Sequence, residues 1–430
     1  MRLMGNMNIE NNELYMGGVS TVSLVEKYGT PLNVIDEEQV RDKCRRYAKN
    51  FRIDEGNRVA YAGKAFLSLH MCKIIKEENL YLDVVSGGEL FTAYKSGFPI
   101  HRIYFHGNNK TLDEIEMGIE LGVGVFVVDN FYELDLINEV AKKKGRIQRI
   151  IIRVTPGIEA HTHDYIKTGQ IDSKFGFTML EDNVLKVVNK AIKYDNIHFA
   201  GIHCHIGSQI FDIKPYEDAV DTMFDIANKI KHSTGVSIEE IDLGGGFGVY
   251  YTEGDEPKPI DKFCEHILEK AESKSRELNI KMPIMTIEPG RSIIGNAGVT
   301  LYTVGSIKNI PNVRKYVSVD GGMSDNIRPA LYNAQYEGVL ANKADFTEKE
   351  LVTVCGKCCE SGDILLKDIM LPNVESGDIL AIMSTGAYGY SMANNYNKLL
   401  KPAVVTVNSG IDQLICKRET YEDIIKNEIL

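Results

Sequence analysis

The sequence lacks the features of a membrane or secreted protein. No apolar run approaches the roughly 20 residues that a membrane-spanning helix needs. The opening segment has no hydrophobic stretch of the kind that a secretory signal carries. Its 8 cysteines are spread over 430 residues, so we expect free thiols rather than a disulfide framework. These absences predict a soluble protein of the cytoplasm, with no membrane partner.

An excess of basic charge is also absent. The chain has 49 Lys and Arg against 60 Asp and Glu, a formal net charge of −11. This sign argues against broad binding to nucleic acid or to an anionic membrane, although a local basic pocket for a small anion is compatible with it. No repeat, low-complexity tract or proline-rich linker is visible, while 43% hydrophobic residues are ordinary for a globular protein. We therefore expect tightly packed domains.

Short apolar runs alternate with segments of helical spacing through the first two thirds of the chain. The predicted strands are Val59–Ala62, Leu82–Val85, Ile103–Phe105, Val125–Asp129, Ile150–Thr155, Phe199–His205, Glu240–Leu243 and Met285–Glu288. Such alternation predicts βαβ units and a parallel sheet. Eight units match the size of a (β/α)8 barrel of the TIM type. A doubly wound open sheet is the alternative, which strand count alone does not exclude.

After about Arg291 the pattern changes to strand-like runs joined by turns rich in Gly, Asn and Asp. This pattern predicts a separate β domain, of sandwich or barrel type. The expected division is an N-terminal segment over 1–31 that joins the β domain, a barrel over 32–293, and the C-terminal β domain over 294–430. Leu32–Ile35 is a further short strand that could belong to either part.

Residues with useful chemistry follow the predicted strands at their carboxyl ends, where barrels build their active sites. They are Lys64 after the first strand, Asp83 and Ser86 at the end of the second, His106 after the third, His205 and Ser208 at the end of the sixth, Gly244–Gly246 after the seventh, and Glu288 and Arg291 at the end of the eighth. Scattered placement would be the ordinary expectation. The clustering therefore predicts one site at this end of the barrel.

The glycine-rich turn LGGGFG suits a phosphate, because glycine has no Cβ to hold an anion away from backbone N–H groups. A turn without function is the alternative. The spacing is not G-x-G-x-x-G, and no G-K-[ST] follows, which disfavours a dinucleotide and excludes a P-loop. We therefore expect a small phosphate-bearing cofactor.

Lys64 has small apolar neighbours, whereas most lysines are solvated surface residues. Desolvation there would lower the pKa of its amine and favour Schiff-base chemistry with a carbonyl. A lysine, a phosphate loop and an acid together indicate pyridoxal phosphate, with Glu288 as the partner of the pyridine nitrogen. His205 could stack on the ring, or it could be a core histidine satisfied by hydrogen bonds.

Two H-x-H pairs, His203 with His205 and His161 with His163, raise the possibility of a metal site. A hydrolytic zinc site needs at least three converging ligands, and no further ligands are evident from the sequence. We therefore predict no metal.

The segment CGKCCESGD contains Cys355, Cys358 and Cys359. No second C-x-x-C pair completes a structural zinc site. Buried thiols are one reading, and a cysteine that acts as a proton donor beside Glu360 is the other. The sequence does not decide between them.

Taken in order, several motifs resemble the diaminopimelate decarboxylase family, in the alanine-racemase-like, fold type III group of pyridoxal-phosphate enzymes. These motifs are YAGKA, DVVSGGEL, HGNNK, HTHDYIKTGQIDSKFG, HIGSQ, LGGGFG, EPGR, RPALY, CESGD and GAYGYSMANNYN, and they span about residues 30–400. The resemblance implies a (β/α)8 barrel followed by a β domain. It also implies a homodimer in which CESGD of one subunit completes the site of the other.

The resemblance assigns roles position by position. It implies that Lys64 binds the cofactor covalently and that Cys359 donates a proton. The implied cofactor contacts are Lys64, Asp83, His205, Ser208, Gly245, Gly246, Glu288, Pro289, Gly290, Arg291 and Tyr388, and the implied substrate contacts are Arg291, Arg328, Tyr332, Glu360 and Tyr388. Lys357 and Cys358 stand where a proline and an aliphatic residue are expected. The adjacent thiols leave the donor open, and we choose Cys359 because it adjoins ESGD.

The implied reaction is decarboxylation of meso-diaminopimelate to L-lysine and CO2, the last step of lysine biosynthesis. The non-reacting end of this substrate needs a cation for its carboxylate and an anion for its ammonium. Arg328 and Arg291 suit the first and Glu360 the second. The alternatives are a related decarboxylase for D-ornithine, D-lysine or carboxynorspermidine, a non-catalytic relative, and a metal-dependent barrel hydrolase that uses the H-x-H pairs.

Overall fold

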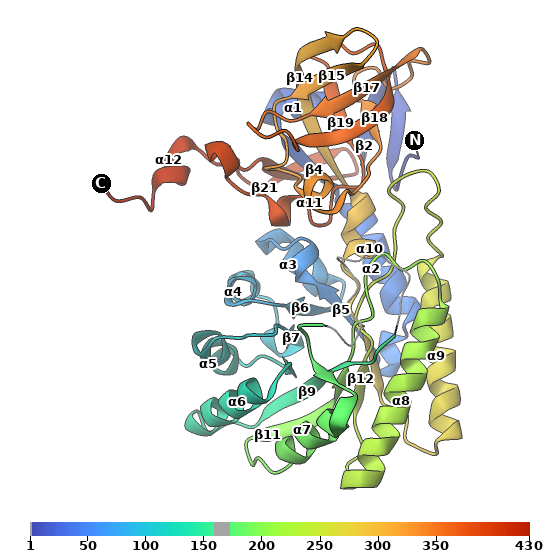
Figure 1. The fold of residues 1–430 in the computed structure, drawn as a ribbon, viewed down its shortest axis with the longest axis vertical. Coiled ribbons are helices and arrows are strands. Elements are labelled where there is room, and N and C mark those ends of the chain that lie inside the picture. The colour runs from blue at the N-terminus through green and yellow to red at the C-terminus, as the bar shows by residue number, and fades with distance from the viewer. Residues whose placement is uncertain (1, 159–172) are drawn as a thin grey trace. The chain divides into compact units, whose positions relative to one another are not determined.

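Eight parallel strands form a closed barrel in the computed structural model, which describes residues 2–158 and 173–430 (Figure 1). The strands are β5 (Arg58–Ala62), β6 (Tyr81–Val84), β7 (Ile103–Phe105), β8 (Val125–Val128), β9 (Gln148–Thr155), β11 (Ile197–His203), β12 (Glu240–Asp242) and β13 (Ile284–Ile287). They pair in the order β5-β6-β7-β8-β9-β11-β12-β13, and β13 pairs with β5. A two-residue strand, β10 (Phe177–Thr178), adds to β9. This closure confirms the barrel prediction and shows that the open-sheet alternative is wrong.

Helices follow the barrel strands as the spacing predicts. They are α3 (Leu69–Glu77), α4 (Gly87–Lys95), α5 (Leu112–Leu121), α6 (Phe131–Lys143), α7 (Asn183–Ala191), α8 (Lys214–Thr234) and α9 (Ile260–Glu277). Four of them are preceded by an N-cap residue, whose side chain accepts a hydrogen bond from the backbone N–H three residues later. These N-cap residues are Ser68, Ser86, Thr111 and Asn130. Ser86, which closes a predicted strand among the reactive residues, therefore caps α4.

The barrel interior is filled by side chains from alternate strand positions. Ala60, Tyr104, Val125, Val127 and Ile151 are buried there in one cluster with Ala200. Such a packed interior leaves the loops at the strand ends to build a site.

The second unit is a mostly β structure. Strands β1 (Met7–Glu10), β2 (Glu13–Met16) and β3 (Val19–Ser20) form a small sheet beside α1 (Thr21–Tyr28). A larger sheet has the order β18-β17-β15-β14-β4-β20-β21, and β19 joins it through β14 and pairs with β16. Its strands are β4 (Leu32–Asp36), β14 (Gly298–Ile310), β15 (Arg314–Val319), β16 (Gly338–Leu340), β17 (Lys349–Cys355), β18 (Ile364–Pro372), β19 (Ile379–Ile382), β20 (Ala403–Asn408) and β21 (Ile411–Cys416).

The limits of the two compact units differ from the expected domain boundaries. The barrel unit comprises Lys43–Gly248 and Pro257–Gly290, and the β unit comprises Met1–Asp42, Val249–Glu256 and Arg291–Leu430. Strand β4 belongs to the β unit, because it pairs with β14 and β20 and is buried at all five positions. Helix α2 (Glu37–Asn50) therefore carries the first change of unit, near residue 42 rather than 31.

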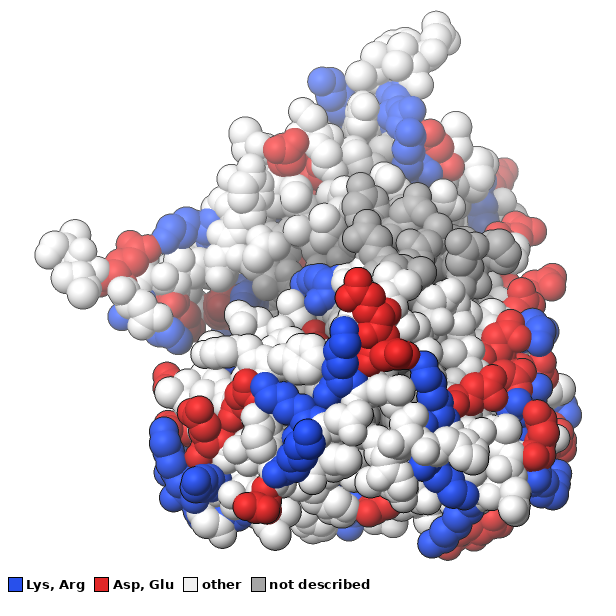
Figure 2. Space-filling view, turned by 60° about the horizontal axis from the view of Figure 1, so that its bottom comes forward, with Lys and Arg blue, Asp and Glu red and all other residues white. Residues whose placement is uncertain are grey.

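Acidic and basic side chains are interspersed over the face drawn in Figure 2. Many of the charged side chains of the barrel unit form ion pairs, such as Lys270 with Asp221 at 2.8 Å and Arg46 with Asp261 at 3.2 Å. Within residues 2–158 and 173–430, no helix has the length and apolar character needed to cross a membrane.

Candidate active site

Three loops at the carboxyl ends of β11, β12 and β13 contact one another through backbone atoms. The Glu288 N–H donates to the Gly244 carbonyl at 2.8 Å, and the Gly245 N–H donates to His205 Nδ1 at 3.2 Å. A Cβ at Gly245 would overlap the Glu288 carbonyl oxygen, and one at Gly246, whose φ is +108°, would lie 2.6 Å from Gly207 O. The glycines of LGGGFG are therefore required for this close approach. At this turn, backbone atoms rather than side chains face the loops that follow β11 and β13.

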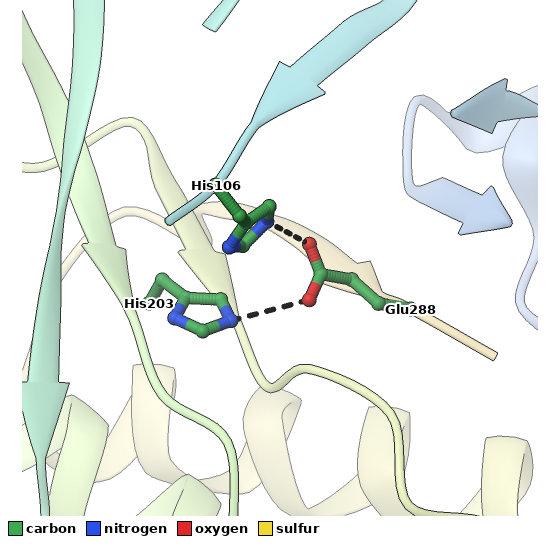
Figure 3. Close-up of side chains that lie close together, drawn as sticks. All are labelled: His106, His203 and Glu288. Atoms are coloured by element: carbon green, nitrogen blue, oxygen red, sulfur yellow. Dashed lines mark hydrogen bonds and ion pairs between the residues drawn. The ribbon is translucent and has the colours of Figure 1, made fainter. Parts of the chain in front are cut away.

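Glu288 is held by two histidines from other strands (Figure 3). His106 Nε2 lies 2.6 Å from Glu288 Oε1, and His203 Nε2 lies 3.2 Å from Oε2. The three residues are buried and directly follow β7 and β13 or end β11. Burial favours the neutral acid, but the electrostatic interactions and hydrogen bonds with His106 and His203 prevail and hold the pKa of Glu288 well below its usual range. Glu288 is therefore a buried carboxylate.

His203 is a neutral hydrogen-bond donor in this group. Burial lowers its pKa to about 3. Its Nδ1 has no hydrogen-bond partner among the described residues. The neutral ring therefore carries its proton on Nε2, which donates to Glu288.

The same three side chains offer ligand atoms within 4.8 Å of one another, a geometry that could hold a metal ion. Zinc ligands about 2.0–2.1 Å from a tetrahedral ion lie roughly 3.3 Å apart. The 2.6 Å contact between His106 and Glu288 is shorter than that and is a direct hydrogen bond. The geometry suits a hydrogen-bonded carboxylate better than a metal centre.

The H-x-H spacing does not make a ligand pair in this fold. His203 contacts Glu288, whereas His205 Nδ1 accepts from Gly245. Burial, followed by the nearby charge of Lys64, lowers the pKa of His205 well below its usual value, so its ring is neutral. The second pair, His161 and His163, lies outside the described residues.

Lys64 lies on a short 3-10 turn, Gly63–Ala65, directly after β5. Its side chain is exposed, so the desolvation expected around its amine is not found. The backbone beside it is tightly packed: the Ala62 N–H donates to Pro289 O at 3.1 Å, and a Cβ at Gly290 would lie 2.9 Å from the Ala62 Cβ. The loop of Pro289 and Gly290 thus holds the Lys64 turn in position.

Asp83 is the penultimate residue of the neighbouring strand, β6, and is buried close to this group. Its Oδ1 lies 3.8 Å from His106 Nε2. Burial raises the pKa of Asp83 to about 6, while His106 and Lys64 act in the opposite direction. Lys64 therefore lies near enough to act on both Asp83 and His205. Ser208, half-buried, follows His205 on the loop after β11.

A second group of predicted residues lies in the β unit. Arg291 begins α10 (Arg291–Ile294), Arg328 begins α11 (Arg328–Tyr332), and both are buried. Arg291 and Arg328 each donate to the Tyr251 hydroxyl, at 2.6 and 3.2 Å, and Arg328 also donates to the Tyr336 hydroxyl at 2.7 Å. The Arg291 guanidinium lies 4.7 Å from the centre of the Tyr388 ring. These contacts form a buried cationic cluster lined by tyrosines.

Tyr251 and Tyr336 were not predicted as site residues from the sequence. Tyr251 comes five residues after Gly246, in the short segment Val249–Glu256 that belongs to the β unit. The only local signal is a tyrosine pair after the glycine turn. Tyr332, the last residue of α11, is half-buried.

The CESGD segment separates its two adjacent thiols. Cys359 and Glu360 are exposed, whereas Cys358 is buried. Burial and then the charge of Asp363 raise the pKa of Cys358 to about 11. Asp363 fixes the turn, because its Oδ2 accepts from the Cys358 N–H at 2.8 Å and its Oδ1 from the Met323 N–H at 2.7 Å. Of the two thiols, Cys359 is the one open to a reaction partner.

Comparison with known proteins gives consistent relatives. Residues 37–295 match the family described as pyridoxal-dependent decarboxylase, pyridoxal binding domain. A diaminopimelate decarboxylase of Halalkalibacterium halodurans is 50% identical over 415 residues, which cover 96% of this chain and 94% of that protein. One from Bacillus subtilis is 49% identical over 422 residues, covering 98% and 96%. The chain belongs to the diaminopimelate decarboxylase family.

A solved member of this family has the same fold. The crystal structure of the M. jannaschii diaminopimelate decarboxylase in complex with L-lysine has a TM-score of 0.92 and is 38% identical, covering 99% of this chain and 98% of that chain. Membership of the family agrees with the resemblance drawn from the motifs.

Proposed function

We propose that the protein decarboxylates meso-diaminopimelate to L-lysine with pyridoxal 5′-phosphate as cofactor. The observation that carries this proposal is the buried, ionised Glu288, in one unit with the glycine turn and the Lys64 turn. An acid, an anion-binding backbone and an amine are the three parts that this cofactor needs. The family of the relatives supports the choice of substrate.

The residues fit the cofactor. When bound, pyridoxal phosphate supplies a conjugated ring that accepts the electron pair left when the carbon–carboxylate bond breaks. Lys64 would hold it covalently, which its exposed amine permits. Glu288 would hold the proton of the ring nitrogen, because its carboxylate stays ionised between two histidines. His205 would stack on the ring as a neutral imidazole, and Asp83 would be a further cofactor contact.

The phosphate group would bind where the glycine loops meet. Gly245 and Gly246 have no side chains to block an anion from their backbone N–H groups. Ser208, the turn of Pro289 and Gly290, Arg291 and the Tyr388 hydroxyl are the remaining members of the proposed phosphate site.

The substrate contacts are Arg291, Arg328, Tyr332, Glu360 and Tyr388. The planar fork of a guanidinium matches a carboxylate, so the two arginines would bind the carboxylate of the non-reacting end. Glu360 would bind the ammonium of that end. Because these contacts desolvate full charges, loss of one partner should weaken binding by several kcal/mol.

Cys359 would donate the proton that replaces the departing carboxylate. It is exposed, whereas the burial of Cys358 and the raised pKa of its thiol disfavour that residue. We further propose a homodimer in which the exposed Cys359 and Glu360 serve the partner's site. Mixing Lys64→Ala with Cys359→Ala subunits would then restore about a quarter of the activity, because half of the dimers are mixed and each has one intact site. No recovery after subunit exchange would contradict shared sites.

A substrate panel tests the function directly. CO2 release is measured with meso-diaminopimelate, lysine and ornithine in the presence of added pyridoxal phosphate, with Lys64→Ala as the inactive control. We expect turnover of meso-diaminopimelate alone. Turnover of only lysine or ornithine would assign a related decarboxylase, and no cofactor binding by either protein would indicate a non-catalytic relative. Loss of activity with a chelator would indicate a metal-dependent enzyme.

A further inference from the structure

Tyr251 lies where two buried arginines meet. Its hydroxyl accepts a hydrogen bond from Arg291 Nη1 at 2.6 Å and another from Arg328 Nη1 at 3.2 Å. The two guanidinium carbons also lie 5.7 and 5.4 Å from the centre of its ring. The tyrosine therefore contacts both cations through its oxygen and its aromatic face. It packs edge-to-face on Tyr336, with ring centroids 5.3 Å apart.

Two cations buried beside each other repel, and both have lost water. Arg328 forms no ion pair with a carboxylate among the described residues, and its partners are the hydroxyls of Tyr251 and Tyr336. The Tyr251 oxygen has two lone pairs, and each guanidinium takes one. Although burial favours the neutral phenol, the charges of Arg291 and Arg328 lower the pKa of Tyr251. The phenol oxygen is thus the shared acceptor that lets both guanidinium groups stay side by side.

We propose that Tyr251 is a positioning residue that joins Arg291 and Arg328 into one clamp for a substrate carboxylate. This inference rests on the proposed function, in which both arginines contact the non-reacting end of the substrate. It adds a prediction about ligand selection. L-lysine retains the carboxylate of that end, whereas cadaverine has none. Tyr251 should therefore strengthen the binding of L-lysine and leave the binding of cadaverine unchanged.

The test uses Tyr251→Phe, which keeps the ring and removes the oxygen. Calorimetric titration of the cofactor-loaded protein should show L-lysine binding weakened at least about tenfold, the effect of losing hydrogen bonds to charged groups. Cadaverine binding should change by less than about twofold. With meso-diaminopimelate, KM should rise by a similar factor while kcat stays within about threefold. Tyr250→Phe is the matched control, because the Tyr250 hydroxyl donates to Glu337 at 2.8 Å and not to an arginine.

Unchanged L-lysine binding in Tyr251→Phe would overturn the proposal, and so would an equal loss for L-lysine and cadaverine, which indicates general damage. Should Tyr251→Phe fail to fold, the single and double variants Arg291→Lys and Arg328→Lys decide the question. If Arg291 and Arg328 act through one oxygen, the loss of L-lysine affinity in the double variant should be at least about threefold smaller than the product of the two single-variant losses. A double-variant loss equal to that product would overturn the clamp.

The wild-type protein separates this proposal from the proposed function. Preferential binding of L-lysine over cadaverine without turnover of meso-diaminopimelate would reject the function and leave the clamp standing. Equal affinity of the wild-type protein for L-lysine and cadaverine would overturn the clamp.

Discussion

Replacing Glu288 by Gln tests the central feature of the barrel site. The carboxylate accepts from His106 and His203 at 2.6 and 3.2 Å and stays ionised while buried. The amide offers one acceptor and one donor group in the same volume. At one of the two imidazoles an N–H would then face an N–H, and His203 cannot relieve the conflict by moving its proton, because its Nδ1 has no acceptor among the described residues.

The expected kinetic effect follows from the lost charge. A carboxylate about 4 Å from a protonated ring nitrogen is worth about 4 kcal/mol at an effective dielectric constant near 20. The amide recovers part of this by hydrogen bonding, so we expect kcat for CO2 release to fall at least about a hundredfold, or about 2.7 kcal/mol of barrier. The free energy of unfolding should change less. The loss of two charge-assisted hydrogen bonds destabilises the fold, but the variant no longer has the cost of burying a charge.

The assay is CO2 release from meso-diaminopimelate with saturating cofactor, alongside thermal unfolding of the same preparation. Glu239→Gln is the matched control. Glu239 also contacts a histidine, His198, at 2.7 Å, but it precedes β12 and so lies at the opposite end of the strands. A Glu288→Gln enzyme with kcat within about threefold of wild type would refute the assigned role.

Three further predictions concern other residues of the site. Lys64→Ala should abolish the near-visible absorbance of bound cofactor, and borohydride reduction of the wild-type protein followed by mass spectrometry should find the label on Lys64; a label elsewhere would contradict its role. Cys359→Ala should slow turnover at least about tenfold with cofactor still bound, as loss of a positioned proton donor does, whereas Cys358→Ala should have a smaller effect; the reverse order would assign the donor to Cys358. Burial raises the pKa of Asp83 to about 6 in the folded protein, so its ionisation opposes folding above that pH and the penalty disappears as the pH falls toward 4. Asp83→Asn should therefore gain up to about 3 kcal/mol of unfolding free energy relative to wild type at pH 7 and little at pH 4, and a difference that does not change with pH would disprove the raised pKa.

The sequence by itself determined the barrel. Its apolar runs recur with strand length between segments of helical period, and that local pattern sets which elements form and in what order. The strand Val125–Val128 ends one residue before the expected Val125–Asp129. Because all the strands are parallel, the carboxyl-end positions of Lys64, His106 and Glu288 were predicted together. The motifs also determined the family.

The β unit was harder to predict. In strand β18 the apolar pattern is interrupted by Lys367 and Asp368, which are both exposed. The sequence left open which unit strand β4 belongs to, because five buried residues fit a strand in either unit. Its hydrogen-bond partners, β14 and β20, are distant in the chain, and only the fold selects them.

Only the tertiary structure decided which side chains meet. Glu288 pairs with His106 across 182 residues and with His203 across 85, and the stagger of the strands, rather than any local spacing, brings the three together. The same holds for Tyr251, which reaches Arg328 across 77 residues, and for the thiols, where burial distinguishes Cys358 from Cys359. A periodic pattern records which face of an element is apolar. It does not record strand order, register or solvent exposure, on which side-chain pairing and the charge state of each group depend.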